Sequence, residues 1–283
     1  MTTFIDRHTR TQLLNGVYEA GNRVMEIYQK GFDVDFKEDT SPLTAADTAA
    51  HYALVELLHE LTPEVPVLSE ESAHIPWERR RLWSRYWLVD PLDGTKEFIK
   101  GNGEFTLNIA LVEQGEPVFG VVHAPVLQRT WLGQYGEGSW RFGDNPDAPQ
   151  EIFIRSLPES NECRWKIVGS RSHGSDEFEA FCAALPEHER ISMGSSLKLC
   201  LVAEGEADLY PRLAPTSEWD TAAAHAVVTA AGGVVLNART LQPLRYNQED
   251  STLNPWFVAA GERSPAWEQP LSFCLTPREP INS

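Results

Sequence analysis

Two aspartates at the end of an apolar run are the residues of this sequence whose types and spacing most clearly suggest chemistry. Residues 86–89 are aromatic or β-branched enough to predict a buried strand, and Asp90 and Asp93 follow them. The proline after Asp90 should end the ladder pairing and the glycine after Asp93 should give a tight turn, so one turn would present both carboxylates and the Leu92 carbonyl. Hard divalent cations such as Mg²⁺ bind oxygen ligands of this kind. The run therefore indicates a cation site, where the hydroxyl of Thr95 could orient a water molecule.

An Asp-x-x-Asp-Gly sequence is also an ordinary turn, and most such turns bind nothing. Two further segments favour the metal interpretation. Glu70 follows the apolar residues 65–68, so a second strand also ends in carboxylates, and Asp220 stands at or near the first turn of an alanine-rich helix. Carboxylates brought together from these segments would repel one another strongly unless cations joined them.

These segments, in this order, resemble the inositol monophosphatase superfamily of Mg²⁺-dependent, lithium-sensitive phosphatases. The resemblance spans roughly residues 16–260. Within it, residues 37–47, 69–71 and 93–98 resemble the branch that cleaves 3′(2′),5′-bisphosphate nucleotides. Inositol-specific members tend to carry Asn where this chain has Glu97. The resemblance implies a layered αβαβα sandwich with the site between two lobes.

The resemblance also implies a ligand set. A first Mg²⁺ would be bound by Glu70, Asp90 and the carbonyl of Leu92. A second would be bound by Asp90, Asp93 and Asp220, and a third, weaker ion would share Glu70. Two or three ions per site would neutralise phosphate charge and activate water for attack on phosphorus.

The identity of the general base stays open between two carboxylates. In the superfamily a threonine hydroxyl orients the attacking water, and Thr95 matches that position. Its partner is either Glu70 or, as in the nucleotidase branch, Asp47. An aspartate in the first turn of a helix is also favoured by the helix dipole alone, and this holds for both Asp47 and Asp220.

Residues in the second half of the chain are predicted to bind the nucleotide. Ser195, Ser196 and Lys198 open a helix, whose free N–H groups and dipole suit the phosphate that is not cut. Arg212 would add a bidentate contact, and His173 would face the adenine ring by analogy with relatives. A serine at a helix start is also an ordinary N-cap, and a lone histidine in a loop is usually solvated. The full predicted substrate set is Asp93, Gly94, Thr95, Ser170, His173, Ser195, Ser196, Lys198, Arg212 and Asp220.

The composition limits the classes of function. With 283 residues, 42% of them hydrophobic, the chain is long and apolar enough for one domain or two packed lobes. A net charge of −17 argues against a polymeric nucleic acid as partner, because backbone binding needs clustered Lys and Arg. The four cysteines show neither zinc spacing nor a dense disulfide framework, which favours reduced thiols in the cytoplasm.

Targeting signals are not evident in the sequence. Residues 1–10 lack the layout of a signal peptide, and no apolar run reaches the length of a membrane span. We therefore expect a cytoplasmic protein without an integral membrane segment. Bacterial relatives of this type associate peripherally with the cytoplasmic side of the inner membrane, but no feature of this sequence argues for that.

The pattern along the chain predicts an α+β fold. Helical spacing predicts helices over residues 9–30 and 44–61, and three strand-like runs within residues 105–134 predict an antiparallel meander. From residue 166 onward, strands alternate with helices, which indicates an α/β part. We expect an N-terminal α+β lobe carrying the metal site (1–150), a C-terminal α/β lobe (151–261) and a flexible tail (262–283).

The resemblance implies a 3′(2′),5′-bisphosphate nucleotidase, a phosphoric monoester hydrolase of sulfur assimilation. It would release the 3′-phosphate of adenosine 3′,5′-bisphosphate and act also on the 5′-phosphosulfate analogue, as a monomer or homodimer. One alternative is the same chemistry on inositol phosphates or fructose 1,6-bisphosphate. Another is a catalytically silent metal-binding protein that senses the nucleotide, but such a protein would be expected to lack a ligand or Thr95, and every matched position is present.

Overall fold

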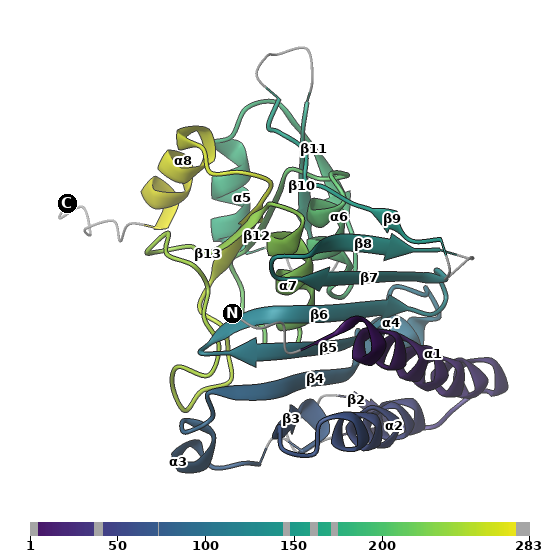
Figure 1. The fold of residues 1–283 in the computed structure, drawn as a ribbon. Helices are drawn as coiled ribbons and strands as arrows, with labels where there is room; N and C mark the ends of the chain where they lie inside the picture. Colours follow the sequence, from purple (N-terminus) through teal and green to yellow (C-terminus); the bar gives the residue numbers. More distant parts are fainter. Residues whose placement is uncertain are drawn as a thin grey trace.

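The computed structural model describes residues 5–36, 42–72, 74–143, 148–158, 164–170 and 175–275. In this part of the chain, helices and sheets alternate in five layers (Figure 1). The helical layers are α1 (Arg7–Lys30) with α2 (Ala45–Leu61), α6 (Leu197–Ala203) with α7 (Ala222–Ala230), and α5 (Asp176–Ala183) with α8 (Pro265–Leu275). A seven-stranded sheet separates the first two pairs and a five-stranded sheet the last two, so the αβαβα sandwich is confirmed.

The larger sheet carries the predicted meander. Its strands, in spatial order, are β3 (Val67–Ser69), β4 (Arg85–Asp93), β5 (Thr106–Glu113), β6 (Glu116–Ala124), β7 (Arg129–Gln134), β8 (Gly138–Phe142) and β9 (Gln150–Glu151). Only β3 and β4 pair in parallel among these described strands, and β5 to β7 form the antiparallel meander. Along β4, Tyr86 and Leu88 pack toward α6 and α7, whereas Trp87 and Val89 pack toward α1 and α2. The strand is buried on both faces, which explains its unbroken apolar sequence.

The smaller sheet follows later in the chain. Its strands, in spatial order, are β11 (His188–Ser192), β10 (Trp165–Gly169), β12 (Leu209–Arg212), β14 (Phe257–Ala260) and β13 (Val234–Asn237). β10 pairs in parallel with β11 and β12, while β14 pairs antiparallel with both of its neighbours. The remaining short elements are β1 (Val34–Phe36), β2 (Pro42–Thr44), the 3₁₀ helix η1 (Glu70–Ser72), α3 (Trp77–Arg80) and α4 (Thr95–Lys100).

Two glycines let the central helix α7 lie directly on the larger sheet. A Cβ atom at Gly120 would stand 2.1 Å from the carbonyl oxygen of Ala223, and one at Gly133 would stand 2.5 Å from that of Ala226. Any side chain at either glycine would therefore push the helix away. This close approach brings the turn that carries Asp220, just before α7, over the larger sheet and toward the end of β4.

The predicted flexible tail is wrong for the part that the structure describes. Helix α8 occupies Pro265–Leu275 and buries Trp267 and Leu271 completely, in a cluster with α5 and the smaller sheet. The Trp267 indole donates to the carbonyl oxygen of Glu262 at 3.1 Å. An internal proline, Pro270, weakens the helical signal in the sequence, and tertiary packing stabilises the helix despite it.

Two further expectations concern domains and membranes. Strand β9 crosses the predicted lobe boundary at residue 150, and the division into two lobes stays a prediction. No helix in the described ranges combines the length and the apolar character that a membrane span requires.

Candidate active site

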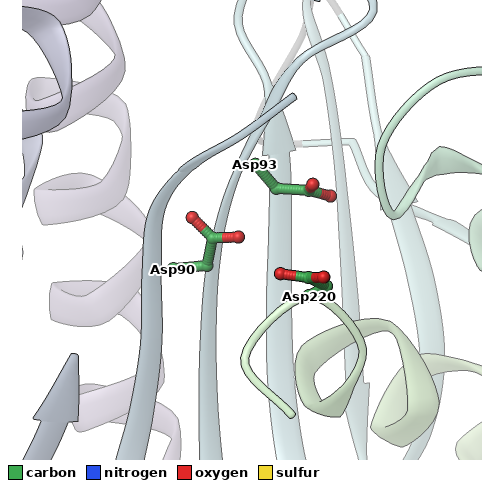
Figure 2. Close-up of side chains that lie close together, drawn as sticks. All are labelled: Asp90, Asp93 and Asp220. Carbon is green, nitrogen blue, oxygen red and sulfur yellow. The ribbon is translucent and has the colours of Figure 1, made fainter. Parts of the chain in front are cut away.

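Three aspartates from separate parts of the chain converge at one point. Asp90 and Asp93 belong to β4 and Asp220 to the turn before α7, and one carboxylate oxygen of each lies within 4.8 Å of the others (Figure 2). Residues three apart on a regular strand would face opposite sides. Here Asp90 pairs with Asn108 and Asp93 with Thr106, so three steps on β4 match two on β5. This β-bulge turns both carboxylates to the same side.

Asp90 has the surroundings of a cation ligand. Its side chain is buried, and Oδ1 accepts a hydrogen bond from the Leu92 N–H at 3.0 Å. Oδ2 is also buried and has no hydrogen-bond partner among the described residues. Burial, followed by the charges of Glu70, Asp93 and Asp220, raises the pKa of Asp90 well above its usual value. A buried carboxylate oxygen without a partner is costly, so this site fits a hard cation that would pair with it.

Asp93 is held by the segment that precedes α6. Its Oδ2 accepts from the Ser195 hydroxyl at 2.6 Å and from the Ser196 N–H at 2.5 Å. Burial and the nearby Asp220 raise the pKa of Asp93 to about 6, while Lys198 and the two serines lower it. Asp93 therefore faces the other carboxylates with one of its oxygens fixed in direction.

Asp220 lies just before α7, whose N-cap residue is Thr221. Its Oδ2 accepts from the Thr216 hydroxyl at 2.6 Å and from the Ser217 N–H at 3.0 Å. Burial raises the pKa of Asp220 and these two hydrogen bonds act in the opposite direction. The side chain is thus fixed by its own turn, and its carboxylate lies beside those of Asp90 and Asp93 on β4 (Figure 2).

Glu70 begins the 3₁₀ helix directly after β3. The parallel register pairs Ser69 with Val89, so Glu70 stands beside Asp90 at the sheet edge, and its charge raises the pKa of Asp90. Glu70 does not belong to the group of three aspartates found among the described residues. Its role as a ligand, like that of the Leu92 carbonyl, stays a prediction.

Asp47 and Thr95 are brought together by the start of α2. Asp47 Oδ2 accepts from the N–H and the hydroxyl of Thr44, at 2.8 and 2.6 Å, and closes a capping box. Its Oδ1 accepts from the Thr95 hydroxyl at 3.2 Å, and Thr95 also lies 3.2 Å from the Leu92 carbonyl oxygen. Burial raises the pKa of Asp47 above its usual value. The helix-cap and the catalytic interpretations of Asp47 therefore use different oxygens and are compatible.

A pocket next to the aspartates is lined by basic as well as acidic side chains. Among its lining residues are eight that the sequence predicted: Asp93, Gly94, Ser170, Ser195, Ser196, Lys198, Arg212 and Asp220. Lys198 is only 7% exposed, and its Nζ donates to the Ser195 carbonyl at 2.5 Å and lies 5.6 Å from the centre of the Tyr210 ring. Burial lowers the pKa of Lys198 to about 8. Arg212 donates to the Pro215 carbonyl at 2.6 Å, while its buried Nε has no partner in the described part of the chain.

The sequence did not predict some residues of the site, and one predicted residue lies outside the described part of the chain. His173 lies outside the described residues, although Ser170 lines the pocket at the end of β10. Lys96 also lines the pocket, and its charge next to Thr95 was a signal that could have found it. Thr106 and Asn108, which contact the serines before α6, gave only the weak signal of polar residues in an apolar strand.

Several known proteins are similar to this chain. The model of the inositol monophosphatase family matches residues 7–265. The 3′(2′),5′-bisphosphate nucleotidase CysQ of Salmonella typhimurium is 50% identical over 241 residues, which are 84% of this chain and 94% of that protein. CysQ of Escherichia coli K12 is 49% identical with the same coverage, 84% and 94%. The crystal structure of CysQ from Bacteroides thetaiotaomicron, a bacterial member of the inositol monophosphatase family, has a TM-score of 0.79 at 42% identity and covers 90% of this chain and 97% of that one.

Proposed function

Because the chain belongs to the inositol monophosphatase family, we propose that it is a 3′(2′),5′-bisphosphate nucleotidase that converts adenosine 3′,5′-bisphosphate to AMP. The observation that carries the substrate assignment is a pocket lined by two groups of charged side chains, the carboxylates of Asp93 and Asp220 and the basic groups of Lys198 and Arg212, here called its acidic end and its basic end. A bisphosphate nucleotide has a matching pair of groups. The 3′-phosphate would lie at the carboxylates with their cations, and the 5′-phosphate at the basic end.

The carboxylates would hold two or three Mg²⁺ ions. Glu70, Asp90 and the Leu92 carbonyl would bind one, and Asp90, Asp93 and Asp220 would bind the other, with a third ion sharing Glu70. The buried, unpartnered Oδ2 of Asp90 supports this assignment, since a cation would supply its missing partner. When bound, such ions neutralise the charge on the phosphate and make water a better nucleophile.

Thr95 and Asp47 would handle the proton of the attacking water. When the Thr95 hydroxyl donates to Asp47 Oδ1 rather than to the Leu92 carbonyl, both of which lie at 3.2 Å, the Thr95 oxygen can accept a hydrogen bond from water. Asp47 would then serve as the base through Thr95. The 3.2 Å contact favours Asp47 over Glu70 as the partner of Thr95.

The basic end would bind the phosphate that is kept. Lys198 offers an ammonium group, and the unpartnered Nε of Arg212 offers a further donor. The 5′-phosphosulfate analogue has the same 3′-phosphate and an anionic 5′ group, so it would be a second substrate.

The cytoplasm is the proposed location. Cys182 and Cys200 are free and buried, as expected for a protein of a reducing compartment. The proposal covers either a monomer or a homodimer, because no residue assigned to the site requires a second copy.

A substrate panel tests this function. Phosphate release by the purified protein with Mg²⁺ would be measured for adenosine 3′,5′-bisphosphate, inositol 1-phosphate and fructose 1,6-bisphosphate. We expect kcat/KM for the nucleotide to exceed the others by about 100-fold or more, because inositol 1-phosphate has no second phosphate and fructose 1,6-bisphosphate carries its two phosphates on a sugar without a base. Chelation of the metal should abolish release. Equal or greater activity on inositol 1-phosphate would contradict the assignment.

A further inference from the structure

A buried hydroxyl network lies behind Asp93 and has no part in the chemistry described above. Thr106, on β5, stands opposite Asp93 in the sheet register and is 0% exposed, so it cannot touch a bound molecule. Its Oγ1 lies 2.6 Å from Ser195 Oγ and 2.8 Å from Ser196 Oγ. Asn108, 1% exposed, adds its amide, since Nδ2 donates to Thr106 at 3.1 Å and Oδ1 accepts from Ser196 at 2.8 Å.

The direction of these hydrogen bonds follows from the carboxylate. An ionised aspartate only accepts, so Ser195 must give its single hydroxyl proton to Asp93 Oδ2. Ser195 Oγ can then only accept in its 2.6 Å contact with Thr106, which makes Thr106 the donor. Thr106 in turn accepts from Asn108. The donors thus run in one direction, from Asn108 through Thr106 and Ser195 to Asp93, and bonds aligned in this way strengthen one another.

We propose that Thr106 is a positioning residue for the cation site. Its hydroxyl holds Ser195 so that the serine hydroxyl and the Ser196 N–H fix Asp93 Oδ2, and thereby the direction in which this carboxylate faces Asp90 and Asp220. The inference rests on the proposed function to the extent that Asp93 is a Mg²⁺ ligand. Mutation of a residue that orients a metal ligand typically lowers metal affinity by about 10- to 100-fold.

The backbone of the same segment needs such support. Ser195 has φ of 54°, in the left-handed region that residues other than glycine seldom adopt. The preceding Gly194 donates its N–H to Glu104 Oε2 at 2.8 Å, and a Cβ there would come within 2.9 Å of Glu97 Cγ. The segment is therefore held on both sides of Ser195 by residues of the other half of the chain.

Ser195 also contacts both an acidic and a basic residue of the pocket. Its hydroxyl donates to Asp93 and its carbonyl accepts from Lys198 Nζ. The two serine hydroxyls and the Ser196 N–H are directed at Asp93 and Asn108, while a contact of this segment with the phosphate stays a prediction. Their contribution to the reaction would be made through the metal ligand.

The test is Thr106→Val, which keeps the branched shape and removes the hydroxyl. Mg²⁺ binding would be measured without substrate, by titration calorimetry and by the rise of Tm with Mg²⁺. We expect Mg²⁺ to bind about 10-fold more weakly, with KM for adenosine 3′,5′-bisphosphate at saturating Mg²⁺ within about twofold of the unmodified protein, since Thr106 does not contact the substrate. Thr106→Ser, the matched control that keeps the hydroxyl, should bind Mg²⁺ like the unmodified protein.

Unchanged Mg²⁺ affinity in Thr106→Val, or an equal loss in Thr106→Ser, would overturn the inference. If Thr106→Val does not fold, Ser195→Gly removes the next hydroxyl in the chain and suits the positive φ, and it must then show the same weaker Mg²⁺ binding. Because the titration measures Mg²⁺ binding without substrate, its result is independent of which phosphate ester is cleaved. A failed substrate panel and a failed positioning role are therefore distinguishable.

Discussion

The two ends of the pocket hold opposite charges, and burial disfavours the charged form at both. At the acidic end, burial raises the pKa values of Asp90, Asp93 and Asp220. At the basic end, burial lowers the pKa of Lys198 to about 8. Asp93 and Lys198 attract each other, but for each of them burial has the larger effect. Because burial outweighs the attraction between the two groups, each is suited to a further ligand of opposite charge: cations for the carboxylates and a phosphate for the basic side chains.

The largest expected effect on activity comes from removing a carboxylate of the acidic end. Asp93→Asn and Asp220→Asn each remove one negative charge with almost no change of volume. We expect kcat to fall by more than the roughly 100-fold upper range for residues that only orient a ligand, because these carboxylates would bind the cation directly. Circular dichroism and Tm should show the fold intact. Near-normal Mg²⁺-dependent turnover in either variant would contradict the two-ion assignment.

Removing a charge from the basic end should weaken substrate binding rather than turnover. Lys198→Ala should raise KM for adenosine 3′,5′-bisphosphate by about 10- to 100-fold and lower kcat much less, since the contact is the same in the ground and transition states. Adenosine 3′-phosphate, which lacks the 5′-phosphate, should be affected far less. Lys100→Ala, which removes the same charge from the exposed end of α4, is the matched control.

The contrary outcome for Lys198 is also informative. Its Nζ donates to the Ser195 carbonyl, so the side chain could act by supporting the segment that holds Asp93. An equal loss with both nucleotides would show that this support is its main role, and the 5′-phosphate would then have to bind elsewhere.

A smaller effect is expected from pH. The ammonium form of Lys198 would bind phosphate, and its pKa of about 8 means that the charge is lost as pH rises through that value. KM for adenosine 3′,5′-bisphosphate should therefore rise above about pH 8, while below it KM should be constant with respect to this group. The same profile measured with Lys198→Ala should lack the rise. A rise of equal size in the variant would assign the titration to another group.

The smallest effect on catalysis is expected from helix α8, which packs on the far side of the smaller sheet. Trp267→Ala should lower the free energy of unfolding by about 3 to 5 kcal/mol, because the indole is fully buried in the cluster with α5. Denaturant unfolding would measure this change. The folded variant should keep the KM and kcat of the unmodified protein, and a changed Mg²⁺ dependence would show that α8 influences the pocket.

The sequence allowed the acidic residues to be predicted because they stand next to one another or at strand ends. Asp90 and Asp93 share one short run, Glu70 follows a recognisable apolar segment, and Asp220 precedes an alanine-rich helix. The proline between the aspartates predicted a strand end, whereas the structure has a bulge within β4. The bulge depends on pairing with β5, and that pairing is not encoded locally.

Other features depend on packing between distant segments. The direction of Ser195 and Ser196 toward Asp93 follows from contacts with Thr106 and Asn108, which lie nearly ninety positions away in the chain. Helix α8 is stabilised by burial of Trp267 rather than by its own propensity. Neither could be predicted from periodicity, because the partner residues are not neighbours in sequence.

The most direct test of the two-ended pocket is the identity of the product. Adenosine 3′,5′-bisphosphate would be incubated with the protein and Mg²⁺, and the nucleotide product identified by ³¹P NMR. If the phosphate bound at the carboxylates is hydrolysed and the phosphate bound at Lys198 and Arg212 is kept, the product is adenosine 5′-phosphate. Inorganic phosphate is then released from the 3′ position. Adenosine 3′-phosphate as the main product would contradict the assignment of the two ends.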